Sequence, residues 1–358
     1  MLGRMEGAHI PVTLKEILSQ PEIWRNSLGE LHRNGMLESI LQATDSRAEW
    51  LFVGCGSSFY LAEAAAATWT LLTNQPARAL PASEVLLFPD LTVRAAGKTQ
   101  VVVISRSGQT SEAVRAADLL SRHYRFPTLG ITCSAESLLE KVCDRTVRLP
   151  AADEKSTVMT RSFSSMLMAL QSLASGKSGA TEFSSALTQM SDHFAVSIDS
   201  LAQRIEEFVA AHAFADYVFL GQGPFYALAR EASLKVMEMS CSYGQAFHTL
   251  EFRHGPKAIV SPETCLTFFL SGSGLLAESE VLAEIHGLGG VTIAICNDAN
   301  DDIRRASDFV FELGFYGPEL AMLAPFIVPA QLLGCFTGVK KNLNPDEPKN
   351  LSRVVILD

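Results

Sequence analysis

Residues 50–60 read Trp-Leu-Phe-Val-Gly-Cys-Gly-Ser-Ser-Phe-Tyr, and residues 217–226 read Tyr-Val-Phe-Leu-Gly-Gln-Gly-Pro-Phe-Tyr. Each stretch has an apolar run, then Gly-x-Gly, then the start of an alanine-rich helical pattern. An apolar run that ends in glycine is typical of a buried parallel strand followed by a tight turn. Because the feature occurs twice, we expect the chain to contain two copies of one structural unit.

The repeat continues along both halves at an offset of roughly 165 residues. Helical patterns between the apolar runs predict parallel strands joined by right-handed crossovers. We therefore expect two doubly wound parallel sheets, each a flavodoxin-like three-layer sandwich with its ligand site at the carboxyl ends of the strands. The paired stretches are 101–108 with 266–274, 128–133 with 291–296, and 146–149 with 309–313.

A chain of 358 residues is too long for one ordinary core, which agrees with the repeat. Helical patterns before and between the two copies, and a polar tail that ends in an apolar run, complete the organisation. The predicted regions are an N-terminal helical lead-in (1–45), a first domain (46–175), a helical linker (176–210), a second domain (211–340) and a docked C-terminal tail (341–358).

The bulk composition excludes several classes of protein. The net charge of -10 and a pI of about 5.4 argue against a nucleic-acid partner. We find no uninterrupted apolar stretch of about 18 residues and no signal-peptide core in residues 1–10, so we expect neither a membrane span nor export. Seven scattered cysteines without a C-x-x-C pair indicate reduced thiols in the cytoplasm and no metal site or cofactor.

The segment 105–111, Ser-Arg-Ser-Gly-Gln-Thr-Ser, follows an apolar run and opens a helical pattern. Backbone N–H groups at a helix start attract a dianion, and hydroxyls add donors without adding charge. The alternative is an ordinary helix cap with spare serines. The second copy, 271–276, has leucines where the first has further donors, so we expect one phosphate site per chain. The candidate ligands in the first copy are Ser105, Arg106, Ser107, Gln109 and Thr110.

The loop 54–58 lies at the end of the preceding strand of the same half. Cys55 could be a nucleophile, but no histidine is near it in the sequence, and a small buried thiol suits a tight turn. We favour the structural interpretation of Cys55. Ser57 and Ser58 are better candidates, as hydroxyls that contact a sugar.

Glu231, Lys235 and Glu238 are spaced to share one face of a helix. A solvated stripe of ion pairs is the simpler explanation. However, the matching helix of the first half carries almost no charge, which favours a lined cavity. His254 precedes Gly-Pro and is therefore expected on a turn. A histidine and a carboxylate are what sugar-ring opening and proton transfer between adjacent carbons require.

At this point the chain resembles a known family, the paired SIS (sugar isomerase) domains. The pattern is that of the isomerase half of glucosamine-6-phosphate synthase and of free-standing amino sugar 6-phosphate deaminase/isomerases, including the galactosamine-6-phosphate deaminase type. The motifs occur in one order over nearly the whole chain. They are K-E-I-x-x-Q-P at 15–21, C-G-S-S at 55–58, S-x-S-G-x-T at 105–110, S-T-V-M-T-R-S-F at 156–163, E-x-x-L-K-x-x-E at 231–238, F-R-H-G-P-K at 252–257 and N-L-S-R-V-V at 350–355.

The resemblance implies a role for each matching position. It makes Glu238 the carboxylate that moves a proton between C1 and C2, with Lys235 assisting beside it. It makes His254 the ring-opening histidine, contributed across the interface of a homodimer. The implied substrate ligands are Ser105, Ser107 and Thr110 for the phosphate, with Arg106 where the synthase has glutamine, Ser58 for a sugar hydroxyl, and Thr157 and Met159 on a second sugar-contacting loop.

Two departures from the synthase pattern bear on the reaction. We expect no glutaminase domain, and the tail lysine of the synthase is Arg353 here, which cannot form a Schiff base. Both favour a catabolic deaminase/isomerase that converts an amino sugar 6-phosphate to a ketose 6-phosphate. Open alternatives are an aldose–ketose phosphate isomerase, a fructosamine-6-phosphate deglycase and a non-enzymatic sugar-phosphate sensor, and a sensor would need neither Glu238 nor His254.

Overall fold

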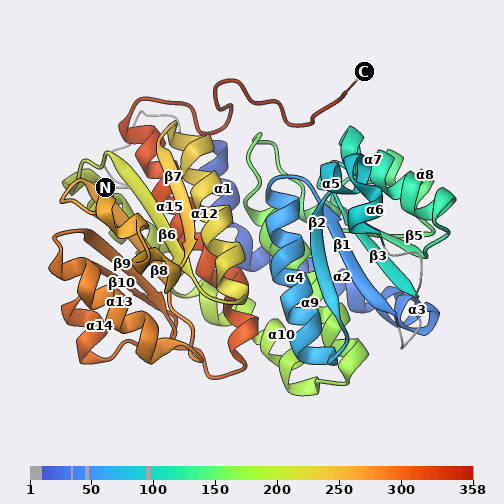
Figure 1. Cartoon of the computed structure of the whole chain (residues 1–358), viewed down its shortest axis with the longest axis horizontal. Coiled ribbons are helices and arrows are strands. Elements are labelled where there is room, and N and C mark those ends of the chain that lie inside the picture. The colour runs from blue at the N-terminus through green and yellow to red at the C-terminus, as the bar shows by residue number, and fades with distance from the viewer. Residues whose placement is uncertain (1–9, 34, 45–47, 94–97, 358) are drawn as a thin grey trace. The chain divides into compact units, whose positions relative to one another are not determined.

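The computed structural model describes residues 10–33, 35–44, 48–93 and 98–357 (Figure 1). The start of the chain, where we expected no signal peptide, therefore lies largely outside the described residues. The chain divides into two compact units. Unit 1 comprises Met1–Ser19, Lys155–Thr160 and Asp192–Leu351, and unit 2 comprises Gln20–Glu154, Arg161–Ser191 and Ser352–Asp358.

Within the described residues, each unit contains one five-stranded sheet whose strands all run parallel. The order is β2-β1-β3-β4-β5 in unit 2 and β10-β9-β8-β6-β7 in unit 1. Numbered within its own half, each sheet has the order 2-1-3-4-5, which confirms two flavodoxin-like, doubly wound domains. The strands are β1 (Glu49–Gly54), β2 (Ala77–Pro81), β3 (Thr99–Ile104), β4 (Thr128–Thr132), β5 (Arg145–Arg148), β6 (Asp216–Gly221), β7 (Tyr243–His248), β8 (Thr264–Phe269), β9 (Val291–Cys296) and β10 (Phe309–Glu312).

The edge strands β2 and β7 are absent from the sequence prediction, which had four strands in each half. Their sequences, Ala-Arg-Ala-Leu-Pro and Tyr-Gly-Gln-Ala-Phe-His, contain no apolar run and are only half-buried or exposed. An edge strand has one neighbour and needs no continuous apolar sequence, so the pattern that reveals a central strand does not reveal these two.

The repeated Gly-x-Gly has the same structural cause in both units. A side chain at Gly54 would overlap the carbonyl of Ser58, and one at Gly221 would overlap the carbonyl of Phe225. The second glycine of each pair, Gly56 or Gly223, has a φ of 55° or 54°. The strand therefore passes against the first turn of the following helix, and the turn uses backbone angles that favour glycine.

Helices cover both faces of the sheet in unit 2. On one face, side chains of β1 and β3 form a core with α5, α7 and α8. On the other face, the rings of Trp50 and Trp69 stack at 3.6 Å, and α4 packs against α9. The helices are α2 (Gln20–Arg33), α3 (Met36–Ala43), α4 (Ser57–Thr73), α5 (Ala82–Leu87), α6 (Pro89–Thr92), α7 (Ser111–Asp118), α8 (Leu138–Val142), α9 (Arg161–Ser178) and most of α10 (Thr181–Ala195).

Unit 1 has the same layers. Side chains of β6, β8 and β9 pack with α13 and α14 on one face. On the other face, α15 packs against both α11 and α12. Its helices are α1 (Val12–Leu18), α11 (Ile198–Ala211), α12 (Pro224–Ser240), α13 (Leu275–Gly287), α14 (Asp301–Arg305) and α15 (Leu323–Lys340). Shorter helical turns in the two units are η2 (Leu119–His123), η3 (Pro150–Ala152), η4 (Glu251–Arg253), η5 (Pro256–Ile259) and η6 (Glu319–Met322).

Helix α15 is the central helix of unit 1. Together with η6 it forms a stretch, Glu319–Lys340, that is long and apolar enough to cross a membrane, although the sequence analysis expected none. Of its most apolar window, 94% is buried inside the structure, as in the core helix of a folded domain. Gly334 and Gly338 of α15 lie directly against the backbone of α12 at Lys235 and Met239.

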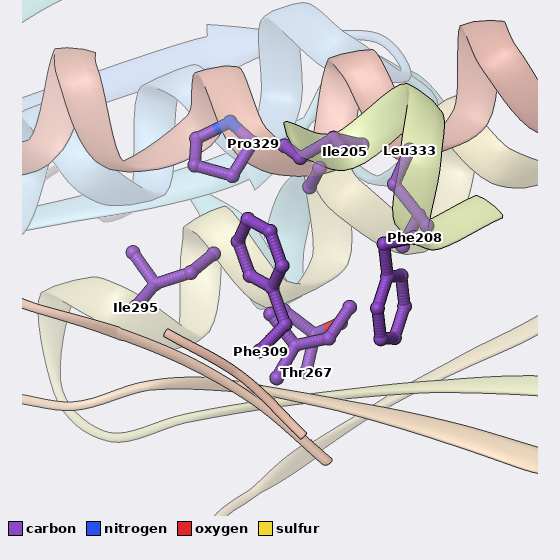
Figure 2. A pocket seen from close by; sticks show the side chains of 9 residues that line it. Ile205, Phe208, Thr267, Ile295, Phe309, Pro329 and Leu333 are labelled. Atoms are coloured by element: carbon purple, nitrogen blue, oxygen red, sulfur yellow. The ribbon is translucent and has the colours of Figure 1, made fainter. Parts of the chain in front are cut away.

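Figure 2 shows a small cavity in the core of unit 1, where side chains of α11 and α15 face those of the sheet. Its volume is about 10 Å³, which is close to the least space that a single water needs. Phe208, Phe309 and Leu333 are among the apolar side chains that line it. The cavity is a packing gap and is too small for a sugar.

Candidate active site

The segment 105–111 connects β3 to α7 in unit 2, as the sequence predicts. The Ser105 N–H donates to the carbonyl of Ile131 in the neighbouring strand at 3.0 Å, which holds the start of the loop. The Gly108 N–H donates to the carbonyl and hydroxyl oxygens of Ser105 at 3.0 and 3.1 Å, and the Ser105 hydroxyl donates to Thr110 Oγ1 at 3.3 Å. Hydroxyls and the helix start thus gather at the carboxyl end of a central strand, where parallel sheets bind ligands.

Ser57 and Ser58 begin α4 at the end of β1, the strand that pairs with β3. Both are buried, and each has a polar contact within the protein. Burial and the nearby Glu112 raise the pKa of the Cys55 thiol to about 11, so this thiol stays protonated at neutral pH. A protonated thiol is a poor nucleophile, in agreement with the structural role expected for Cys55.

The side chain of Arg106 lies inside unit 2, with 5% of it exposed. Its Nη1 is 3.2 Å from Glu154 Oε2, and its Nη2 donates to the carbonyl of Arg353 at 3.1 Å. Glu154 also accepts a hydrogen bond from the Ser162 hydroxyl at 2.5 Å. Arg106 thereby ties the loop 105–111 to the segment before α9 and to the C-terminal tail.

The tail, Ser352–Asp358, is part of unit 2. The Ser111 N–H donates to the carbonyl of Val355 at 3.2 Å, and the Leu357 N–H donates to the Ser111 hydroxyl at 3.0 Å. Arg353 forms an ion pair with Asp153 at 2.5 Å. The tail therefore runs along the start of α7, next to the loop 105–111.

The candidate ligand Gln109 is also held by a backbone carbonyl. Gln109 Nε2 donates to the carbonyl of Glu136 at 3.2 Å and so contacts the loop after β4.

Thr157 and Met159 belong to the short segment of unit 1 that precedes α9. The Thr157 N–H donates to the carbonyl of Asp346 at 2.9 Å, while Glu16 of α1 accepts the Lys155 N–H at 2.6 Å.

The stripe on α12 is buried, which excludes the alternative of a solvated row of charges. Lys235 Nζ lies 3.3 Å from Glu231 Oε1 and 2.5 Å from Glu238 Oε2. The side chains of Glu231 and Lys235 are fully buried, and 18% of the Glu238 side chain is exposed. Burial opposes the charge of Lys235, but the attraction of Glu231 and Glu238 outweighs it and raises the pKa of the lysine. Lys235 is therefore a cation at neutral pH, held against the more accessible carboxylate Glu238.

His254 is exposed in the turn after η4, as expected for a histidine that precedes Gly-Pro. Its N–H donates to the carbonyl of Glu251 at 3.0 Å. Phe252 in the same turn is fully buried and anchors the segment to the core of unit 1. The imidazole thus stands on an anchored, solvent-facing turn.

The structure adds residues that lie outside the sequence motifs. Glu154 and Asp153 hold Arg106 and Arg353, and Asp346 receives three hydrogen bonds from Val12 and Thr13 at the start of α1. A weak signal was present for Glu154, because a buried arginine needs an acidic partner. Among the described residues, no group of three or more His, Cys, Asp or Glu side chains could hold a metal ion.

Residues 45–176 and 194–327 each match the SIS domain family. The chain is 25% identical over 99% of its length to the glutamine–fructose-6-phosphate aminotransferase [isomerizing] of Methanothermobacter thermautotrophicus, and the match spans 58% of that protein. It is also 25% identical to AgaS of Streptomyces coelicolor, a candidate D-galactosamine-6-phosphate deaminase, over 94% of the chain and 91% of AgaS.

Among solved structures, that of a glucosamine-6-phosphate deaminase from Thermotoga maritima is 29% identical in sequence to the chain. The alignment covers 97% of the chain and all of the other protein, with a TM-score of 0.78. The likeness therefore extends over both units and over the segments that carry the candidate residues.

Proposed function

Since the chain belongs to the SIS domain family, with one copy of the domain in each half, we propose that it is an amino sugar 6-phosphate deaminase/isomerase. It would convert an aldosamine 6-phosphate to the ketose 6-phosphate and ammonia. The observation that carries this proposal is the buried Lys235 between Glu231 and Glu238. A buried charge is costly, and a cation held against a partly exposed carboxylate is typical of a catalytic site.

The proposed chemistry assigns a role to each group. Ser105, Ser107 and Thr110 hold the phosphate. His254, contributed by a second copy of the chain in a homodimer, transfers the proton that opens the sugar ring.

Glu238 then removes the C2 proton of the open-chain sugar and returns a proton to C1, which leaves an imine at C2. Water adds to this imine and ammonia leaves, so the product is a ketose. Lys235 stays protonated and stabilises the oxygen that gains negative charge during the transfer.

The test is an ammonia-release assay with glucosamine-6-phosphate, galactosamine-6-phosphate and fructosamine-6-phosphates. We expect ammonia from at least one aldosamine 6-phosphate. Glu238→Gln should lower kcat by about 10²–10⁴-fold, the usual contribution of a general acid–base. The control is Glu280→Gln, an exposed glutamate of α13, which should keep wild-type kcat. No ammonia from any of these substrates, or full activity of Glu238→Gln, would refute the proposal.

One other reaction needs the same residues. Proton transfer between C1 and C2 also interconverts an aldose and a ketose phosphate, and nothing in Glu238 or Lys235 requires an amine at C2. Adding glucose-6-phosphate and tagatose-6-phosphate to the same panel separates the two reactions, because isomerisation would proceed without ammonia release.

A further inference from the structure

The second copy of the phosphate loop, in unit 1, lies between β8 and α13. Its backbone is related to that of the first loop but is displaced by one residue. The Leu270 N–H donates to the carbonyl of Ile295 at 2.9 Å, as the Ser105 N–H does to that of Ile131. The position that matches Ser105 is therefore the buried Leu270, and the serine follows it.

The second loop nevertheless has the internal turn of the first. The Gly274 N–H donates to the Ser271 hydroxyl oxygen at 2.9 Å, just as the Gly108 N–H donates to that of Ser105 at 3.1 Å. In addition, the loop opens the 13-residue helix α13, whose amino end carries partial positive charge. It thus combines a serine turn, backbone N–H donors and a helix start, the combination to which we assign phosphate binding in the first loop.

Two carboxylates of the chain itself occupy these donors. The Ser271 N–H donates to Glu278 Oε2 and the Ser271 hydroxyl to Glu278 Oε1, each at 2.8 Å. From the other side, the Gly272 N–H donates to Glu319 Oε1 and the Ser273 hydroxyl donates to Glu319 Oε2 at 3.2 Å. Glu278 is 1% exposed, whereas Glu319 is half-buried and therefore the more accessible of the two carboxylates.

We propose that the second loop is an anion-binding loop whose anion is supplied by the chain, with Glu278 and Glu319 in the place of a phosphate. Two carboxylates carry the formal charge of one phosphate dianion and supply several acceptor oxygens. The two carboxylates therefore prevent a phosphate from binding to the loop. Substitution of Glu319 would free the Gly272 N–H and the Ser273 hydroxyl for such a ligand.

The space beside Glu319 agrees with this proposal. A cavity of about 230 Å³ adjoins the loop and is lined by Gly272, Glu319, Asn297 and Asp298 with apolar side chains around them. A water takes about 30 Å³ in the liquid, so the cavity has room for a small oxyanion once the Glu319 carboxylate is gone. In this proposal the two loops differ mainly in the anion that they bind: glutamate carboxylates in the second loop and a substrate phosphate in the first.

The test locates oxyanions in crystals soaked in selenate, whose anomalous scattering identifies the loop that binds it. In the wild type we expect no selenate at 271–274, and in Glu319→Ala we expect selenate on the Gly272 N–H and the Ser273 hydroxyl. Glu280→Ala, which removes an exposed carboxylate of α13, should behave as the wild type. Selenate at 271–274 in the wild type, or its absence there in a folded Glu319→Ala protein, would overturn the proposal.

Calorimetric titration with inorganic phosphate gives the second readout. Glu319→Ala should gain a phosphate site at least about tenfold tighter than any weak wild-type binding at this loop, and Glu319→Ala with Ser273→Ala should lose that gain. Glu319→Gln, which keeps the size of the side chain, should gain a weaker site. Binding at 105–111 is a separate peak in the same crystals, so its absence would count against the proposed function and not against this inference.

Discussion

At the scale of single residues, the buried Lys235 makes the most specific energetic prediction. Lys235→Met should lower the free energy of unfolding by about 3–5 kcal/mol, because it removes the cation that pairs with the fully buried Glu231. Urea unfolding measures the loss. The double variant Glu231→Leu/Lys235→Met, which removes both charges, should recover most of it, and a double variant as unstable as the single one would contradict this account.

Glu278 predicts a dependence of stability on pH. Burial, together with the charge of Glu319, raises the pKa of this carboxyl above its ordinary value, although hydrogen bonds from Ser271 oppose the shift. A raised folded-state pKa contributes stability at low pH that is lost as pH rises through it. Relative to the wild type, Glu278→Gln should therefore become more stable as pH rises above the ordinary pKa of glutamate.

Urea unfolding at several pH values checks this, with Glu280→Gln as the exposed control on the same helix. A stability difference for Glu278→Gln that falls as pH rises would show that the hydrogen bonds from Ser271 outweigh the cost of burying the carboxylate.

At the scale of elements, the two Gly-x-Gly turns should respond alike to substitution. Gly54→Ala and Gly221→Ala each place a methyl group against a backbone carbonyl of the next helix, and each should lower the free energy of unfolding by about 1–3 kcal/mol. Gly29→Ala in α2 meets only an ordinary contact and should be neutral or stabilising. Unequal decreases in the free energy of unfolding for the two variants would show that the strand and the following helix are not packed equally closely in the two units.

The strands and loops show which parts of the fold could be predicted from the sequence. The central strands and the loops after them were predictable, because apolar runs that end in glycine or serine have few alternatives. The edge strands β2 and β7 were not, since they lack such runs. Among the site residues, the buried guanidinium of Arg106 bonds to Glu154, a pairing over 48 residues that no local pattern contains.

The burial of Glu231 and Lys235 was also beyond a local pattern. Their spacing alone fits a solvated stripe equally well. The comparison with the matching helix of the first half favoured a lined cavity, and the packing of α12 in unit 1 shows the burial. The displacement of Leu270 relative to Ser105 depends likewise on strand register, which the two short sequences alone leave open.

At the scale of the whole molecule, the proposed dimer can be tested by complementation. If His254 acts in the active site of the second copy, a mixture of Glu238→Gln and His254→Ala chains forms heterodimers with one intact site. Unfolding and refolding the two together should restore about a quarter of wild-type activity, as random pairing requires. If Glu238 and His254 act within one chain, the mixture should stay inactive.

The contact between α12 and α15 has a consequence for variation in this protein. Gly334 and Gly338 let α15 touch the backbone of α12 at the very turns that carry Lys235 and Met239, next to Glu238. Because these glycines have no side chain, the two helices are in backbone contact, and this contact fixes the position of the turn that carries Glu238. A natural variant with alanine at either position would push α15 away from α12 and shift Glu238, with the loop 105–111 unchanged in sequence.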